Sequence, residues 1–132
     1  MLGANLVLVD NNFSHKEKLT SALRKRGFYV WQALSGSEAC DFVMGLKAPF
    51  AMDVVIITEN VPALSLWEFL DFIYNKSDTP TLPVIAIVNS PSTQRVIKAW
   101  GFEVDLILEE DVSADVLSDA IVQVMVARRA ET

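Results

Sequence analysis

Five short apolar runs alternate along the chain with five longer amphipathic segments. The runs cover residues 5–10, 28–33, 53–58, 82–88 and 104–108. The first, third and fourth are nearly continuous and rich in Val and Ile, as in strands buried on both faces of a parallel sheet. The second run is more mixed, which is typical of an edge strand. The alternation therefore predicts a parallel sheet with right-handed crossovers and helices on both faces.

The intervening segments carry signals for the start and end of helices. Ser14 and Glu17 have the spacing of a capping box, and Gly27 is a natural stop. Ser35 and Glu38 repeat the same spacing before a second helix. The expected helices run from 14 to the stop at Gly27, from 35 to about 46, and over about 64–74, 92–100 and 113–129.

Length and composition limit the class of protein. A chain of 132 residues predicts one domain, 1–132, and its 52% hydrophobic content excludes a disordered chain. The net charge of −6 argues against direct nucleic-acid binding through a broad basic surface. Cys40 is the only cysteine, so an internal disulfide is impossible. No apolar run approaches the roughly 20 residues that cross a bilayer, and Met1–Leu6 lack a signal peptide's basic region, so we expect a cytoplasmic protein without membrane contact.

In the order and spacing of its segments, the chain resembles the receiver domain of bacterial two-component response regulators. The best-matched pieces are 8–12, 53–62 and 82–88, supported by 27–30 and 36–39. The resemblance spans residues 5–129 and implies a flavodoxin-like three-layer α/β sandwich, with a five-stranded parallel sheet and five helices. It also implies a site at the carboxyl ends of the strands, where such sheets bind ligands.

Receivers are phosphorylated on a carboxylate that ends the third strand, beside Mg²⁺ held by two acidic residues after the first strand. A hydroxyl residue and a lysine at the ends of the fourth and fifth strands sense the phosphate. The matching positions here are Asp10 and Asn11 for the acidic pair, Thr58 for the acceptor, Val88 for the hydroxyl, Glu109 near the lysine and Leu106 for the aromatic switch residue. A neutral threonine without an evident base is a poor nucleophile, and one carboxylate binds Mg²⁺ poorly. The resemblance therefore implies a degenerate pseudo-receiver that is not an enzyme and holds neither metal nor cofactor.

Other residues near these positions have simpler interpretations. Asp53 begins its run, roughly 17 Å from the site end, so we expect a solvated strand-start residue. Glu59 is expected to point away from the site by strand alternation. His15 would suit a phosphoacceptor or a pH sensor, but nothing in the sequence orients it, so we expect an exposed helix residue. Cys40 is expected to be a small buried residue, and 89–93 to cap the following helix.

The last predicted helix has two distinct faces. We expect a face on the sheet formed by Val116, Leu117, Ala120, Ile121, Val124 and Met125. Val122 and Val126 fall on the opposite, outer arc, and Phe72 likewise falls opposite the core stripe of its own helix. The resemblance implies contacts through the face of the fourth helix, fifth strand and fifth helix. The candidate residues there are Gln94, Lys98, Leu106, Asp119, Val122 and Val126.

Three functions remain open from the sequence. The first is a phosphorylation-independent signalling module that contacts a protein partner or a fused output domain, with a homodimer left open. The chain ends at 128–132, where a receiver's last helix meets a linker, so we expect a domain excised from a longer protein. The second is a small-molecule sensor that uses the altered pocket. The third is an atypical receiver that is still phosphorylated.

Overall fold

The computed structural model describes residues 3–45, 51–58, 68–76, 82–89, 92, 95, 97–98 and 104–130. Its strands are β1 (Asn5–Val9), β2 (Tyr29–Ala33), β3 (Val54–Thr58), β4 (Val84–Val88) and β5 (Leu106–Glu109). In this part of the chain the helices with defined bounds are α1 (Phe13–Lys25), α2 (Gly36–Val43), the π-helical turn η1 (Phe72–Lys76) and α5 (Ala114–Ala130). Each strand agrees with one of the apolar runs to within two residues at either end.

The five strands form one sheet in the order β2-β1-β3-β4-β5, and every neighbouring pair is parallel. The prediction that β2 lies at an edge is confirmed. From β1 the chain passes first to β2 on one side and then to β3 on the other. The strand order therefore reverses between β1 and β3, and Val9 pairs with Ile57 there. The residues that come next, Asp10 and Thr58, lie at the point where such sheets place their sites.

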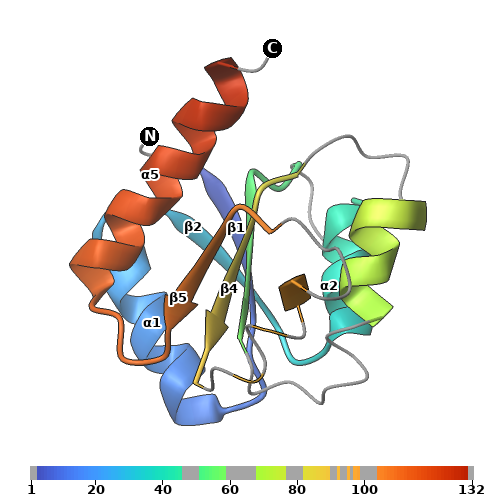
Figure 1. The fold of residues 1–132 in the computed structure, drawn as a ribbon. Coiled ribbons are helices and arrows are strands. Elements are labelled where there is room, and N and C mark those ends of the chain that lie inside the picture. Colours follow the sequence, from blue (N-terminus) through green and yellow to red (C-terminus); the bar gives the residue numbers. More distant parts are fainter. Residues whose placement is uncertain are drawn as a thin grey trace.

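Helices cover both faces of the sheet (Figure 1). Successive strand side chains point to opposite faces, so Val7 and Val9 join one hydrophobic cluster while Leu6 and Leu8 join the other. The first cluster includes Phe42 from α2 and Phe69 from the helical segment 68–71. The second includes residues of α1 and α5, which lie side by side on the other face (Figure 1). This is the expected sandwich of helices, sheet and helices.

The start of α1 differs from the prediction. Its N-cap is Asn12, whose side-chain oxygen accepts a hydrogen bond from the backbone N–H of His15 at 3.0 Å. The prediction that Ser14 caps this helix is wrong, because Asn12 is itself a strong capping residue and stands two positions earlier. The shift moves His15 from the first to the third position of the helix, still within its first turn.

The other helix boundaries agree more closely. Ser35 caps α2 as predicted, with its hydroxyl accepting from the N–H of Glu38 at 3.2 Å. The helix ends at Val43, earlier than the expected residue 46, because Gly45 has φ of 79°, the left-handed conformation that ends helices. The predicted end at Gly27 and the predicted span of α5 hold to within two residues.

The two remaining predicted helices are described only in part. Residues 68–71 are helical and continue into η1, in agreement with the end of the helix expected at 64–74. Ser92, Arg95, Ile97 and Lys98 have helical backbone within the segment expected at 92–100. The rest of both segments lies outside the described residues, so the number of five helices stays a prediction. Among the helices described, none combines the length and apolar character needed to cross a membrane.

Three expected side-chain positions are corrected. Val116 is 52% exposed and does not face the sheet, because it lies at the edge of the arc and in the first turn of α5. Val122 is half-buried and packs against the cluster beneath α1 and α5. Phe72 is half-buried against the cluster beneath α2, not on the outer face. At 3.6 residues per turn Phe72 lies about 60° around the helix from the buried Phe69, so it is on the flank of the core stripe and not opposite it.

Candidate functional site

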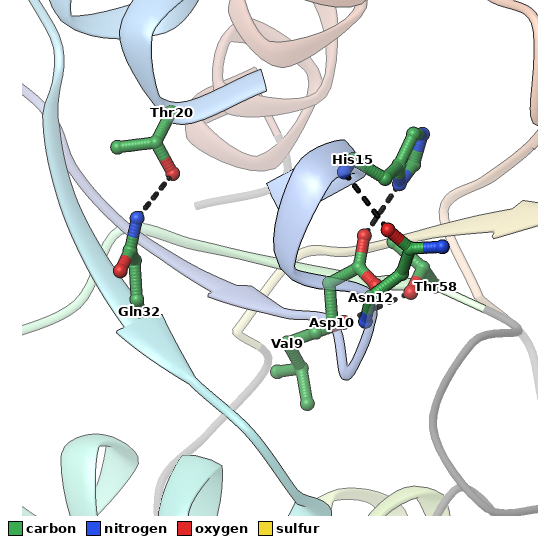
Figure 2. A network of polar contacts seen from close by, with 7 residues as sticks. All are labelled: Val9, Asp10, Asn12, His15, Thr20, Gln32 and Thr58. Atoms are coloured by element: carbon green, nitrogen blue, oxygen red, sulfur yellow. Dashed lines mark hydrogen bonds and ion pairs between the residues drawn. The ribbon is translucent and has the colours of Figure 1, made fainter. Parts of the chain in front are cut away.

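Asp10 is the centre of the site and is completely buried (Figure 2). It follows β1, and its backbone N–H donates to the carbonyl of Ala33 at 3.0 Å, which ties the loop to the end of β2. One carboxylate oxygen, Oδ1, accepts from the N–H of Asn12 at 2.8 Å. The other, Oδ2, lies 2.5 Å from Nδ1 of His15. Both oxygens of the one carboxylate expected in the pocket therefore have partners from the protein itself.

His15 forms an ion pair with Asp10 when protonated and a hydrogen bond when neutral. Its side chain is only 18% exposed, so the prediction of an exposed helix residue is wrong. The physical reason is the true start of α1: side chains of a first turn point back toward the helix N-terminus, and Asp10 lies there. The sequence signal was Asn12, a capping residue that places a histidine at the third helical position. Sequence reasoning read the histidine alone and missed the pair.

Thr58 stands at the end of β3, beside Asp10, with a relative exposure of 1% (Figure 2). Its hydroxyl donates a hydrogen bond to the backbone carbonyl of Val9 at 3.2 Å, within the buried sheet. The hydroxyl hydrogen thus points to a carbonyl oxygen, which is not a base strong enough to remove it. Thr58 is therefore buried at the end of its strand, with its hydroxyl bonded within the sheet.

The other predicted pocket residues are spread over two strand ends, the loop after β1 and the start of β5. Val88 ends β4, is buried and pairs in register with Glu109, which is exposed at the end of β5. Asn11 is exposed in the loop after Asp10, and Leu106 is half-buried against the cluster beneath α1 and α5. The described side chains that meet at the centre are therefore those of Asp10, His15 and Thr58, whereas Asn11 and Glu109 face outward.

The residues present do not fit the Mg²⁺ of a receiver. Such an ion needs several oxygen ligands, and here one neutral amide, Asn11, stands where a second carboxylate would be. The carboxylate of Asp10 already accepts from Asn12 and contacts His15. Among the described residues there is no group of three or more His, Cys, Asp or Glu side chains that could hold a metal ion.

Three other sequence candidates lie away from this centre. Asp53 sits at the opposite end of the sheet, where its Oδ2 accepts from the N–H of Asn5 at 2.7 Å. The prediction of a strand-start residue away from the site is confirmed, although Asp53 is only partly solvated because its carboxylate joins the beginnings of β1 and β3. Cys40 is half-buried, so the prediction of a buried residue holds only in part. Glu59 lies outside the described residues.

The candidate interaction face is described in part. Lys98 and Asp119 are exposed, and Val126 is 53% exposed on α5. Leu106 and Val122 are half-buried and contribute their outer edges only. Gln94 lies outside the described residues. The apolar area on this face is therefore smaller than the sequence pattern suggested.

The comparisons with known proteins identify the fold. No protein-family model matches the sequence, and no curated protein matches it significantly. Among solved structures, the response regulator receiver domain from Clostridium thermocellum is similar with a TM-score of 0.82 and 24% identity, over 98% of this chain and 99% of that one. A CheY-like receiver domain from Methanospirillum hungatei has a TM-score of 0.82 at 15% identity, with the same coverage. The chemotaxis response regulator CheY4 of Vibrio cholerae has a TM-score of 0.75 at 22% identity, over 92% of this chain and 98% of that one.

These likenesses define a class of structure. The fold is the CheY-like fold of response regulator receiver domains, and the structure matches it over nearly the whole chain. Every one of these identities is below 25%, so the likeness concerns the fold and does not extend to the chemistry of the site.

Proposed function

We propose that this chain is a receiver-like signalling module that acts without phosphorylation, through contact with a protein partner or a fused output domain. The observation that carries the proposal is the state of the strand ends at the order reversal. The carboxylate of Asp10 is held by Asn12 and His15, and the acceptor position is a buried Thr58 whose hydroxyl donates to a backbone carbonyl. Because these side chains are bonded within the protein, the pocket favours a single conformation that does not change with phosphorylation.

The chemistry argues in the same direction. Phosphoryl transfer is accelerated mainly by positioning and by charges that stabilise the transferring group. Here the acceptor is a neutral hydroxyl and the pocket lacks the paired carboxylates for a metal. Glu109 at the end of β5 adds a negative charge at the rim, which would repel a phosphate. These features favour a module whose binding surface does not depend on a phosphate.

A direct test is incubation with acetyl phosphate and Mg²⁺, followed by the intact mass. A conventional receiver treated in parallel shows that the reagent is active, and Thr58→Val is the matched variant. We expect no gain of mass in either form of this chain. A phosphate adduct on the wild type that disappears in Thr58→Val would overturn the proposal and favour an atypical phosphorylatable receiver.

The sensor alternative can be separated with the wild type and His15→Ala. A small molecule held by Asp10 and its neighbours would raise the melting temperature of the wild type in a thermal-shift screen. We expect no such ligand to depend on Asp10, because both carboxylate oxygens are already used by Asn12 and His15. A stabilising ligand whose effect is lost in His15→Ala would support the sensor instead.

A further inference from the structure

A groove of about 410 Å³ lies between α2 and the helical segment 68–72, on the face of the sheet opposite α1 and α5. Figure 1 shows the two helices side by side there, α2 in cyan and the other in yellow-green. The apolar side chains that line it are Phe69 and Phe72, with the thiol of Cys40. Its two walls carry carboxylates, Asp41 on α2 and Glu68 and Asp71 on the facing segment. The groove thus combines an apolar floor with an acidic rim.

The charge of the groove acts on a group inside it. The pKa of the Cys40 thiol is raised from 9.0 to about 11, first by burial and then by the negative charges of Asp41 and Glu68. These two carboxylates come from opposite walls of the groove, and both disfavour ionisation of the thiol. Burial is the larger cause of the raised pKa, and the two carboxylates add to it because negative charge disfavours the thiolate.

No cation of the chain neutralises this potential in the part that the structure describes. Neither Asp41 nor Glu68 forms an ion pair with any described residue, and no Lys or Arg side chain is among the described residues that line the groove. Asp71 already has partners, among them Asn75 at 2.7 Å, so the carboxylates available to a ligand are those of Asp41 and Glu68. Carboxylates that border an apolar surface without a cation are a complement for a basic ligand.

We propose that this groove docks a basic, partly apolar peptide segment of a partner protein. An apolar side chain of that segment would cover the half-buried Phe72 and Cys40, above the buried Phe69, and a Lys or Arg would lie between Asp41 and Glu68. Arg suits the place best, because its guanidinium stacks on an aromatic face while it pairs with carboxylates. The inference rests on the proposed function only in taking the module to act through protein contacts.

Other occupants agree less well with these observations. A second copy of this chain carries the same net charge of −6, so the approach of one copy to another is opposed by repulsion. Nucleic acid is repelled in the same way by the acidic rim. A metal ion lacks a group of three suitable ligands among the described residues. A basic peptide is attracted by the charge and also gains from covering the apolar floor.

The experiment uses three synthetic peptides and the amide spectrum of the ¹⁵N-labelled protein. The first peptide is acetyl-Lys-Leu-Arg-Phe-Lys-amide, the second replaces its basic residues with Gln, and the third replaces Leu and Phe with Ser. The protein variants are Glu68→Lys in the groove and Asp111→Lys, an exposed residue after β5, which changes the net charge equally. The melting temperature of each variant checks that it is folded.

We expect the first peptide to shift the amides of Gly36, Ser37 and Cys40, and both altered peptides to bind about tenfold more weakly. Glu68→Lys should weaken the first peptide by a similar factor, while Asp111→Lys should leave it nearly unchanged. Shifts confined to other surfaces, or equal losses in the two variants, would overturn the inference. Self-association that Glu68→Lys abolishes would assign the groove to a second copy instead. None of these outcomes depends on phosphorylation, so the docking inference and the proposed function fail separately.

Discussion

Nδ1 of His15 lies 2.5 Å from Oδ2 of Asp10, so an imidazole of the chain itself contacts the carboxylate at the centre of the strand ends. Asp10 is completely buried, and a buried carboxylate needs hydrogen bonds or an opposite charge to be tolerated. Asn12 and His15 supply these contacts from the same loop and helix start. In a receiver a divalent cation would meet this need, and here a side chain does.

Metal binding should therefore be absent from the wild type and recoverable by substitution. We expect no Mn²⁺ binding to the wild type at millimolar concentration, measured by electron paramagnetic resonance. The double variant His15→Ala with Asn11→Asp should bind, because it frees Oδ2 of Asp10 and adds a second carboxylate. Asn11→Asp alone is the control and should bind more weakly than the double variant. Equal binding by the wild type would refute this account of His15.

The energy of the Asp10–His15 contact can be measured with a double-mutant cycle. His15→Ala should lower the free energy of unfolding by roughly 1–3 kcal/mol, because it leaves a buried carboxylate with one partner fewer. In the background of Asp10→Asn the same change should cost much less. Chemical denaturation of the four proteins gives the coupling energy. A coupling near zero would mean that the short contact contributes nothing to stability.

The thiol of Cys40 predicts a pH dependence at alkaline pH. Its pKa is raised from 9.0 to about 11 by burial and then by Asp41 and Glu68, so the folded protein favours the neutral thiol. An unfolded thiol ionises near 9.0, so this contribution to stability is complete below that pH and is lost as the pH rises through about 11. Thiolate absorbance should show the raised midpoint, and Glu68→Gln should lower it. Denaturation of Cys40→Ala over the same pH range gives the contributions of the other groups, and the difference from the wild type is that of Cys40.

Arg24 occupies one backbone carbonyl of the edge strand. Its Nη2 donates to the carbonyl of Val30 at 2.8 Å, and Val30 belongs to the edge strand β2. An edge carbonyl without a partner is a template for pairing with another chain. We expect Arg24→Ala to increase self-association in light scattering, whereas Lys25→Ala, an exposed neighbour on α1, should not. A monomeric Arg24→Ala would show that the edge is protected by other means.

Two valines of α5 should respond differently to the same substitution. Val126 is 53% exposed, so Val126→Glu should change the free energy of unfolding by no more than about 0.5 kcal/mol. Val122 packs against the core, so Val122→Glu should cost about 1–3 kcal/mol. If the wild type is a dimer through this face, Val126→Glu should separate it in light scattering. A dimer that survives this change would rule out the outer face of α5 as the contact.

The sequence alone was sufficient to predict the parallel sheet, and to predict which of its runs form covered strands and that 28–33 forms an edge strand. Continuous Val and Ile runs predict strands covered on both faces, and the mixed run at 28–33 predicts an edge, because burial on each face leaves its own pattern of polarity. The position of Asp10 and Thr58 at strand ends followed from the same pattern. These properties depend on residues close together in the chain, which sequence periodicity reports directly.

The tertiary structure decided which side chains meet. His15 contacts Asp10 because α1 begins at Phe13, and the choice between Asn12 and Ser14 as the cap depends on how the loop closes over β1. Phe72 packs against the core cluster beneath α2, and it shares the groove with Cys40 of that helix. Such contacts depend on the relative placement of whole elements. The sequence therefore determined the layers of this protein, while packing decided the chemistry of its centre and the charge of its groove.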